Sequence, residues 1–420
     1  MNINIMEKDY RSKRVRQISG ALDYLGNLIM RPRKTDIPEG VINRIAVLKF
    51  DRIGDAVLST PALLALRKLY PQAEIRAYLA PWNRVVFDGI DGIQVEVIDD
   101  ASNVHASSGL SLFGNRKNRK NITDKLKDFS PQLGIDLQGS PLIVRALWSA
   151  GVPYRVGFKR KLLSFLLTHP VTHEDGMHQS EIYLQIPLAL GFSERWPWPT
   201  IPIPETAEKK VEQIIRTHSL KSYLAMHLGS GRSYRRWPLS NFVEFGRQFL
   251  EKYPARKLVL IGGGEDDIFA KSFLARVGDM RDKKSAPRIV NLIGQLSIPE
   301  TVVLLKNADI FIGNESGPMH LASVCGTPSV VFMNGWSGIE RWKPLGDEVV
   351  ILEAKPIHKC EGPACKSDPC PNMAAITVGE ALQAVETILR PSTGASSLND
   401  KTHLKTASPR QSKPLRSRAL

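Results

Sequence analysis

Residues 308–322 read ADIFIGNESGPMHLA, an apolar run that ends in a group of polar and turn-forming residues. The pattern predicts a buried strand that passes directly into a helix. A turn needs the glycines and Pro318, but it does not need Glu315, Ser316 and His320 as well. Free N–H groups at Ser316 and Gly317 suit a phosphate, to which His320 can donate, and Glu315 can bind sugar hydroxyls. The stretch therefore predicts a site for a nucleotide-diphospho-sugar.

Strand-like and helix-like segments alternate on both sides of this stretch. Residues 222–335 contain apolar runs such as KLVLIGGG and PSVVFMNG, separated by helical ones such as FVEFGRQFLEKY. The same alternation begins earlier, with RIAVLKF, AEIRAYLA and LGIDLQG as strands. Such alternation is typical of a parallel sheet covered by helices. We therefore expect an α/β protein of two Rossmann-like, doubly wound halves, with ligands bound beyond the carboxyl ends of the strands.

Composition shifts divide the chain into segments. The stretch SERWPWPTIPIPE contains four prolines and has little helical character, which is typical of a linker between domains. The last thirty or so residues are rich in Ser, Thr, Pro, Lys and Arg, which is typical of disorder. The expected segments are a basic extension at 1–40, a first Rossmann-like domain at 41–192, a linker at 193–205, a second Rossmann-like domain at 206–390 and a disordered basic tail at 391–420.

The chain is strongly basic. It has 57 Lys and Arg against 42 Asp and Glu, a net charge of +15. A charge of this sign favours anionic partners, which include nucleic acid, an anionic membrane face and phosphorylated substrates.

No apolar run is long enough to span a bilayer, and the first residues lack the apolar core of a signal peptide. We therefore expect a cytoplasmic protein.

Two basic segments leave alternatives open. Apolar residues recur at helical spacing between clusters of arginine and lysine near the start of the chain. They are Val15, Ile18, Leu22, Leu25 and Ile29. This helix either docks on the first domain or lies on an anionic membrane surface, and a nucleic-acid arm is a further alternative. The basic stretch GNRKNRKNITDKLKDF is either a solvated face or a guide for a phosphorylated acceptor.

The motif FDRIGDAVLSTPAL follows the first predicted strand. Gly54 permits a close approach of the backbone to a ligand. Asp55 lies where the loop meets the helix, and a carboxylate there either caps the helix or acts as a general base. A general base would accept the proton that an attacking alcohol loses.

The motif HLGSGRSYRRWPLSNF opens the second domain. Ser230 and Gly231 follow a strand, so their N–H groups can hold phosphate oxygens. Arg235 and Arg236 can neutralise a diphosphate leaving group. The alternative is a surface turn with solvated arginines.

The stretch LIGGGEDD follows the next strand. Its glycines suggest a nucleotide contact through Gly262, Gly263 and Glu265, although the spacing is not the GxGxxG of a dinucleotide site.

Three of the four cysteines cluster, at Cys360, Cys365 and Cys370. Zinc sites usually show tighter pairs and a fourth ligand, for which His358 is available. The spacing therefore favours structural or free thiols in a surface loop, and we expect no metal and no cofactor.

Four stretches resemble glycosyltransferase family nine, the ADP-heptose:lipopolysaccharide heptosyltransferases. They are RIGDAVLSTPAL, GSGRSYRRWPLSNF, LIGGGEDD and the long run from Asn291 to Gly335. The resemblance covers about residues 42–390. It implies a GT-B fold in which the N-terminal half binds the acceptor and the C-terminal half binds the nucleotide sugar.

The resemblance also implies a reaction. This reaction is an inverting, metal-independent displacement with Asp55 as the catalytic base, and a heptose passes from ADP-heptose to the phosphorylated lipid A-core of lipopolysaccharide. Arg235 stands where members often have lysine, and Glu315 where many have aspartate. Glu315, Ser316, Gly317 and His320 match the donor-binding segment. The enzyme would work at the anionic inner face of the inner membrane and would not bind nucleic acid.

Alternative functions of other classes find less support. One alternative is a related transferase of the same family that uses another nucleotide sugar or acceptor. An NAD-dependent oxidoreductase would need GxGxxG after the first strand, which FDRIGDA does not provide. A nucleic-acid-binding protein would need a basic face with aromatic residues, but aromatic residues are only 7% of the chain.

Overall fold

The computed structural model describes residues 42–99, 116–159, 163–278, 288–336, 338–360 and 367–390, together with residues 26, 37, 40, 362 and 365. The amphipathic stripe at residues 15–29 and the basic tail lie outside the described residues, apart from residue 26. No helix within the described part of the chain has the length and apolar character needed to cross a membrane.

The first sheet has six strands, all parallel, in the order β3-β2-β1-β4-β5-β6. Its central strand β1 is buried along all but its first residue, as expected for the apolar run RIAVLK covered on both faces. The strands are β1 Arg44–Lys49, β2 Glu74–Leu79, β3 Ile93–Val97, β4 Leu133–Asp136, β5 Tyr154–Phe158 and β6 His169–Val171.

The second sheet also has six parallel strands, in the order β12-β11-β10-β7-β8-β9. If β7 to β12 are renumbered 1 to 6 and the sheet is read from its other edge, the order is 3-2-1-4-5-6, as in the first sheet. Both halves therefore have the doubly wound arrangement expected from the sequence. The strands are β7 Tyr223–His227, β8 Lys257–Ile261, β9 Ile289–Asn291, β10 Ile310–Asn314, β11 Ser329–Met333 and β12 Val349–Glu353.

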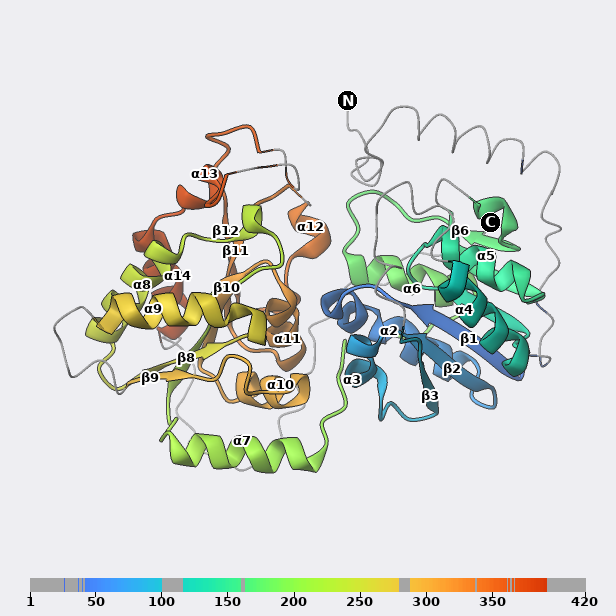
Figure 1. Ribbon diagram of the computed structural model, residues 1–420, viewed down its shortest axis with the longest axis horizontal. Helices are drawn as coiled ribbons and strands as arrows, with labels where there is room; N and C mark the ends of the chain where they lie inside the picture. Colours follow the sequence, from blue (N-terminus) through green and yellow to red (C-terminus); the bar gives the residue numbers. More distant parts are fainter. Residues whose placement is uncertain are drawn as a thin grey trace.

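Helices cover both sheets, and Figure 1 shows the two halves side by side. The first half contains α2 Ile53–Leu69, α3 Arg84–Phe87, α4 Arg116–Phe129, α5 Pro141–Ser149 and α6 Gln179–Ala189, with short 3₁₀ helices at Pro81–Asn83 and Ser164–Leu166. The second contains α7 Glu205–Thr217, α8 Leu239–Lys252, α9 Asp267–Gly278, α10 Ile298–Lys306, α11 Gly317–Cys325, α12 Ile339–Trp342, α13 Pro371–Ala374 and α14 Val378–Leu389, with 3₁₀ helices at Ser233–Arg235 and Gly264–Asp266.

Local sequence explains where the site-forming helix α11 begins and ends. Pro318 stands in its first turn, where a missing N–H costs nothing. Gly326 ends the helix with a φ of 67°, in the left-handed region that glycine adopts without strain. The chain can therefore leave α11 directly into β11.

The two halves touch through α2 and α11, which pack against each other and face each other across the centre of Figure 1. Buried apolar residues from both halves form one continuous cluster, which includes Val57 of α2 and Leu321 of α11. Two hydrogen bonds extend the contact. His178 at the start of α6 bonds the carbonyl of Lys343 (3.0 Å), and Arg341 of α12 donates to Gln179 (2.8 Å).

Candidate active site

The predicted motifs meet at the points where strand order reverses in each sheet. In the first sheet this point lies between β1 and β4, and Asp55 follows β1 at the start of α2. In the second it lies between β7 and β10, and the segments 229–236 and 315–320 follow those two strands. Such switch points are where doubly wound sheets bind ligands. Because α2 packs on α11, the two switch points face each other.

Asp55 stands in the first turn of α2. Its Oδ1 accepts a hydrogen bond from the buried hydroxyl of Tyr183 on α6 (3.0 Å). No described residue donates to Oδ2. Burial and the neighbouring carboxylate of Asp55 raise the pKa of Tyr183 well above its usual value, so this hydroxyl keeps its proton and remains a donor. Tyr183 thus engages one oxygen of the Asp55 carboxylate and leaves the other without a donor among the described residues.

A buried ion pair lies behind Asp55. Lys49, at the end of β1 and fully buried, contacts Asp51 (Nζ to Oδ2, 2.8 Å) and lies over the ring of Tyr183 (3.7 Å). Burial raises the pKa of Asp51 to about 7, and the negative charge of Asp55 adds to this rise against the opposing effect of Lys49. Lys49, Asp51 and Tyr183 were not among the residues predicted from the sequence. Asp51 lies within the motif FDRIGDAVLSTPAL and Lys49 directly before it, and their charge was the only available signal. Tyr183 gave no signal, because it lies 128 residues from Asp55.

Glu315 follows β10 and is almost fully buried, with 3% of its side chain exposed. Its Oε1 pairs with Nη1 of Arg235 at 3.1 Å. Ser230 donates its hydroxyl to the carbonyl of Glu315 (3.2 Å). The structure thus brings the predicted residues of both second-domain motifs into one cluster at the start of α11.

His320 and Gly54 meet at the interface between the halves. A Cβ atom on Gly54 would lie 2.8 Å from Cδ2 of His320. Burial lowers the pKa of His320 to about 3, and the nearby His178 and Arg235 add to this effect. Its Nδ1 is buried and has no hydrogen-bond partner among the described residues. His320 is therefore a neutral ring at pH 7 with one nitrogen left for a ligand.

Three guanidinium groups gather near the same interface. Arg52 lies close enough to Arg232 and Arg235 that these cations, together with burial, lower its pKa. A Cβ atom on Gly231 would lie 2.7 Å from Nη1 of Arg52, so the glycine permits this approach. Gly317, which begins α11, similarly leaves room for Ile53 of α2. Several cations beside two helix starts suit a multiply charged anion.

A chain of polar contacts extends from Ser316 into the second domain. The hydroxyl of Ser316 lies 3.1 Å from Nδ1 of His227, and Nε2 of His227 lies 3.1 Å from the carboxylate of Asp266. Gly263 donates its backbone N–H to the same carboxylate (3.1 Å). Glu265, which the sequence analysis favoured, is exposed, whereas its neighbour Asp266 is buried. A carboxylate two strands away thus helps to orient Ser316.

Arg236 points elsewhere than its neighbour Arg235. It pairs with Asp368 (3.0 Å) in the cysteine-containing loop and lies over the ring of Phe269 (5.1 Å). Of the site residues predicted from the sequence, the structure therefore gathers Gly54, Asp55, Gly231, Arg235, Glu315, Gly317 and His320 at the interface, with Ser230 and Ser316 beside them. Gly263 and Glu265 lie further along the second sheet, and Arg236 is engaged by the loop.

Two Rossmann-like halves that face each other, with a carboxylate on one side and a cationic helix start on the other, form the GT-B architecture. The chain belongs to glycosyltransferase family 9 (heptosyltransferase), whose sequence model matches residues 120–370. This confirms the resemblance seen in the sequence.

Individual relatives agree with this assignment. A putative glycosyltransferase of Haemophilus influenzae is 22% identical over 83% of this chain and 97% of its own length. Lipopolysaccharide heptosyltransferase 3 of Escherichia coli is 21% identical over 82% and 99%. Among solved structures, E. coli ADP-heptose lps heptosyltransferase II superposes with a TM-score of 0.64 at 18% identity, covering 82% of this chain and 98% of that one. A family 9 glycosyltransferase from Veillonella parvula gives 0.66 at 20% identity, with coverage of 82% and 97%. These structures confirm the GT-B fold.

Proposed function

We propose that the protein transfers a heptose from ADP-heptose to a phosphorylated acceptor in the inner core of lipopolysaccharide. Membership of the heptosyltransferase family supports the reaction type. The observation that carries the proposal further is the approach of Asp55 in one half to the Glu315–His320 segment in the other, through the contact of Gly54 with His320. This contact supports the assignment of the proposed base and the proposed donor site to one interface.

The proposed chemical step is a direct displacement with inversion at the anomeric carbon. An acceptor hydroxyl attacks this carbon while the bond from the carbon to the diphosphate oxygen breaks. The hydroxyl proton passes to Oδ2 of Asp55, and ADP leaves with the electron pair of the broken bond. The hydrogen bond from Tyr183 to Oδ1 of Asp55 supports this step, because it engages the other oxygen of the proposed base. A positioned base of this kind contributes roughly 10²- to 10⁴-fold to the rate.

The charge that develops on the diphosphate needs stabilisation. We assign this role to Arg235, Arg52, the N–H groups at the start of α11 and the neutral ring of His320. Guanidinium groups match phosphate oxygens and are permanently charged. These cations supply positive charge without a metal ion in the chemical step. We assign the contact with sugar hydroxyls to Glu315, and its ion pair with Arg235 at the same site supports this role.

The first experiment is calorimetric binding of ADP and ADP-heptose against UDP-, GDP- and dTDP-sugars. We expect selective binding of the adenine series. A second candidate function is transfer of another nucleotide-activated sugar. It is favoured by Glu315, whose carboxylate extends one methylene further than the aspartate that many members carry. Preference for a different nucleotide would overturn the heptose assignment and leave the base assignment intact.

Asp55→Ala tests the base. We expect transfer to fall by at least about 10²-fold while ADP binding changes little, because the variant removes only the proton acceptor. The measurement is turnover with labelled donor beside the binding isotherm of ADP. Turnover near that of the parent protein would remove Asp55 from the base role.

A further inference from the structure

The three clustered cysteines come together in space. The sulfur atoms of Cys360, Cys365 and Cys370 all lie within 4.8 Å of one another. Those of Cys360 and Cys370 are 4.0 Å apart, far more than the length of about 2.05 Å of a disulfide bond. All three are free thiols in the structure. The loop thus converges on a common point rather than on one bonded pair.

The spacing of the sulfurs suits a tetrahedral metal ion. With metal–sulfur bonds of about 2.3 Å, tetrahedral geometry places neighbouring sulfurs about 3.8 Å apart. The observed separations require only small shifts to reach this value. An all-sulfur ligand set selects soft cations such as Zn²⁺ or Fe²⁺ over Mg²⁺ or Ca²⁺. The sequence spacing alone favoured free thiols. Four residues separate each cysteine from the next, and this spacing does not show that the chain brings the three sulfur atoms together.

A second observation comes from Asn334, which follows β11. Its side-chain amide lies 3.7 Å from the sulfur of Cys370 (Nδ2 to Sγ) and donates to the carbonyl of Tyr234 at 2.8 Å. The residue is only 8% exposed, and its Oδ1 is buried with no hydrogen-bond partner among the described residues. A water bound to a metal at the cysteines would supply the missing donor. Buried polar atoms are rarely left unpaired without such an explanation.

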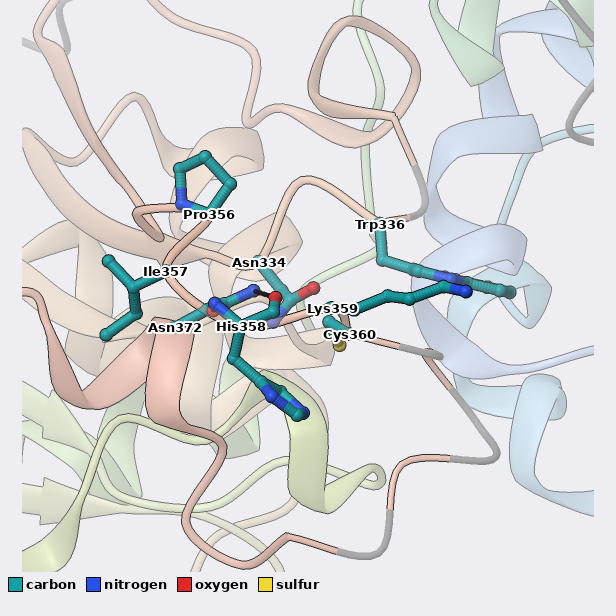
Figure 2. Close-up of a pocket in the computed structure, with 8 residues that line it drawn as sticks. All are labelled: Asn334, Trp336, Pro356, Ile357, His358, Lys359, Cys360 and Asn372. Carbon is teal, nitrogen blue, oxygen red and sulfur yellow. Dashed lines mark hydrogen bonds between the residues drawn. The ribbon is translucent and has the colours of Figure 1, made fainter.

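One of the three cysteines, Cys360, borders a pocket. It has a volume of about 470 Å³ and is lined by Asn334, Trp336, Cys360 and Asn372, among others (Figure 2). His358, which the sequence suggested as a fourth ligand, lines this pocket but is not part of the sulfur cluster. Its backbone N–H instead donates to Asn372 (2.8 Å). The pocket gives solvent a route to the fourth coordination position.

We propose that Cys360, Cys365 and Cys370 bind one soft divalent cation, Zn²⁺ or Fe²⁺, through three thiolates, with water as the fourth ligand. The ion would fix Cys360 and Cys365 to Cys370, which directly precedes α13 of the second domain. The loop in turn supports the segment that carries Arg235. Asp368 pairs with Arg236, and Trp336, which packs against Gly362, meets the ring of Tyr234 edge-on at 5.8 Å. The role is structural and does not depend on which sugar is transferred.

The direct test is metal analysis of the full-length protein purified under reducing conditions. We expect about one zinc or iron per chain by mass spectrometry of the metal content. After chelation, Co²⁺ should restore one equivalent and produce the thiolate-to-cobalt and tetrahedral ligand-field absorption bands. Absence of both the native metal and the Co²⁺ spectrum would overturn the proposal, as would a disulfide between two of the three cysteines under these conditions.

Variants locate the site. Cys360→Ser and Cys365→Ser alter partly exposed positions, and we expect each to lower metal content severalfold and to weaken the cobalt bands. Cys325→Ser is the matched control, because this cysteine lies on α11 outside the cluster. Its thiol donates to two backbone carbonyl groups (3.1 and 3.2 Å). Equal metal content in all three variants would exclude the cluster as the site.

A further readout concerns the loop itself. Lys359 is exposed, so trypsin should cleave after it faster when the metal has been removed. The measurement is the rate of this cleavage in the metal-loaded and chelated proteins. Equal rates would contradict the structural role of the ion.

Discussion

Tyr183 shows how a single residue controls the proposed base. Its hydroxyl occupies one oxygen of Asp55, and its ring lies against Lys49. The ring contact would survive loss of the hydroxyl, whereas the hydrogen bond would not. Removal of the hydroxyl alone therefore tests how Tyr183 orients the carboxylate without changing how its ring packs.

We predict that Tyr183→Phe lowers kcat roughly tenfold, because hydrogen bonds to charged groups contribute about 1.5–3 kcal/mol. The expected change in KM for the donor is small. Steady-state kinetics measures both constants. Tyr253→Phe is the control, since Tyr253 lies in the other half and packs against Phe249. An unchanged kcat in Tyr183→Phe would mean that Asp55 needs no such partner.

His320 gives a prediction for pH. Burial lowers its pKa from 6.5 to about 3 in the folded protein. Below pH 6.5 the unfolded chain takes up a proton that the folded chain refuses. Stability from the neutral ring is therefore complete above about pH 6.5 and is lost as the pH falls toward 3.

We expect His320→Asn to flatten the dependence of Tm on pH between about 6.5 and 3. The control is His218→Asn, which changes a partly exposed histidine in the second domain. Thermal unfolding across this pH range provides the measurement. Parallel curves for the parent protein and His320→Asn would show that another group dominates acid unfolding.

Residues near a motif in sequence were predictable, and residues brought to it by folding were not. Glu315 stands directly after an apolar strand, and Asp55 and His320 lie in the first turns of the helices that follow such strands. This pattern marked all three. Asp266 and His227 form their contact across neighbouring strands β7 and β8. Nothing in the local pattern distinguishes Asp266 from Glu265, because both follow the same glycines. Only the direction of each side chain decides between them.

At the scale of elements, the packing of α2 on α11 determines the site. At Gly54 of α2 no side chain separates the backbone from the ring of His320 on α11, so the two helices approach closely there. Any side chain there must push the helices apart or turn the buried ring.

We predict that Gly54→Ala destabilises the protein by about 1–3 kcal/mol, the usual effect of overpacking. It should also reduce transfer, because the base and the donor segment move apart. Gly264→Ala is the control, since a Cβ atom there meets nothing within 4 Å. Denaturant unfolding and transfer assays measure the two effects. Parent-like behaviour of Gly54→Ala would show that the interface yields without cost.

The sequence pattern predicted the alternating elements of the second half through β11. It did not predict β5, β6 or β12. β6 has only three residues, and β12 is an edge strand with no fully buried position. Short or half-exposed strands carry little hydrophobic periodicity, so the pattern that marks a central strand is absent from them.

The net positive charge of the chain predicts that the protein acts beside an anionic surface. The net charge is +15, and the basic stretch at residues 8–34 lies almost entirely outside the described residues. We propose that this stretch holds the enzyme on the anionic cytoplasmic face of the inner membrane, where each basic residue contributes about 1 kcal/mol.

Deleting residues 1–34 should therefore weaken sedimentation with anionic vesicles while leaving Tm nearly unchanged. Vesicles of neutral lipid serve as the control and should bind neither form. If the truncated protein sediments with anionic vesicles as well as the full chain does, the stretch serves another purpose, such as docking on the first domain.

The repeated strand order of the two sheets has a consequence for how such enzymes diversify. Each half carries its own switch point, and the groups proposed for the base and for the leaving group stand on separate halves. If the two roles are separated in this way, substitutions in one half can change which acceptor receives the sugar. Nucleotide binding by the other half then stays unchanged. Chimeras that join this C-terminal half to the N-terminal half of a relative would then keep the nucleotide preference of the first and take the recipient of the second.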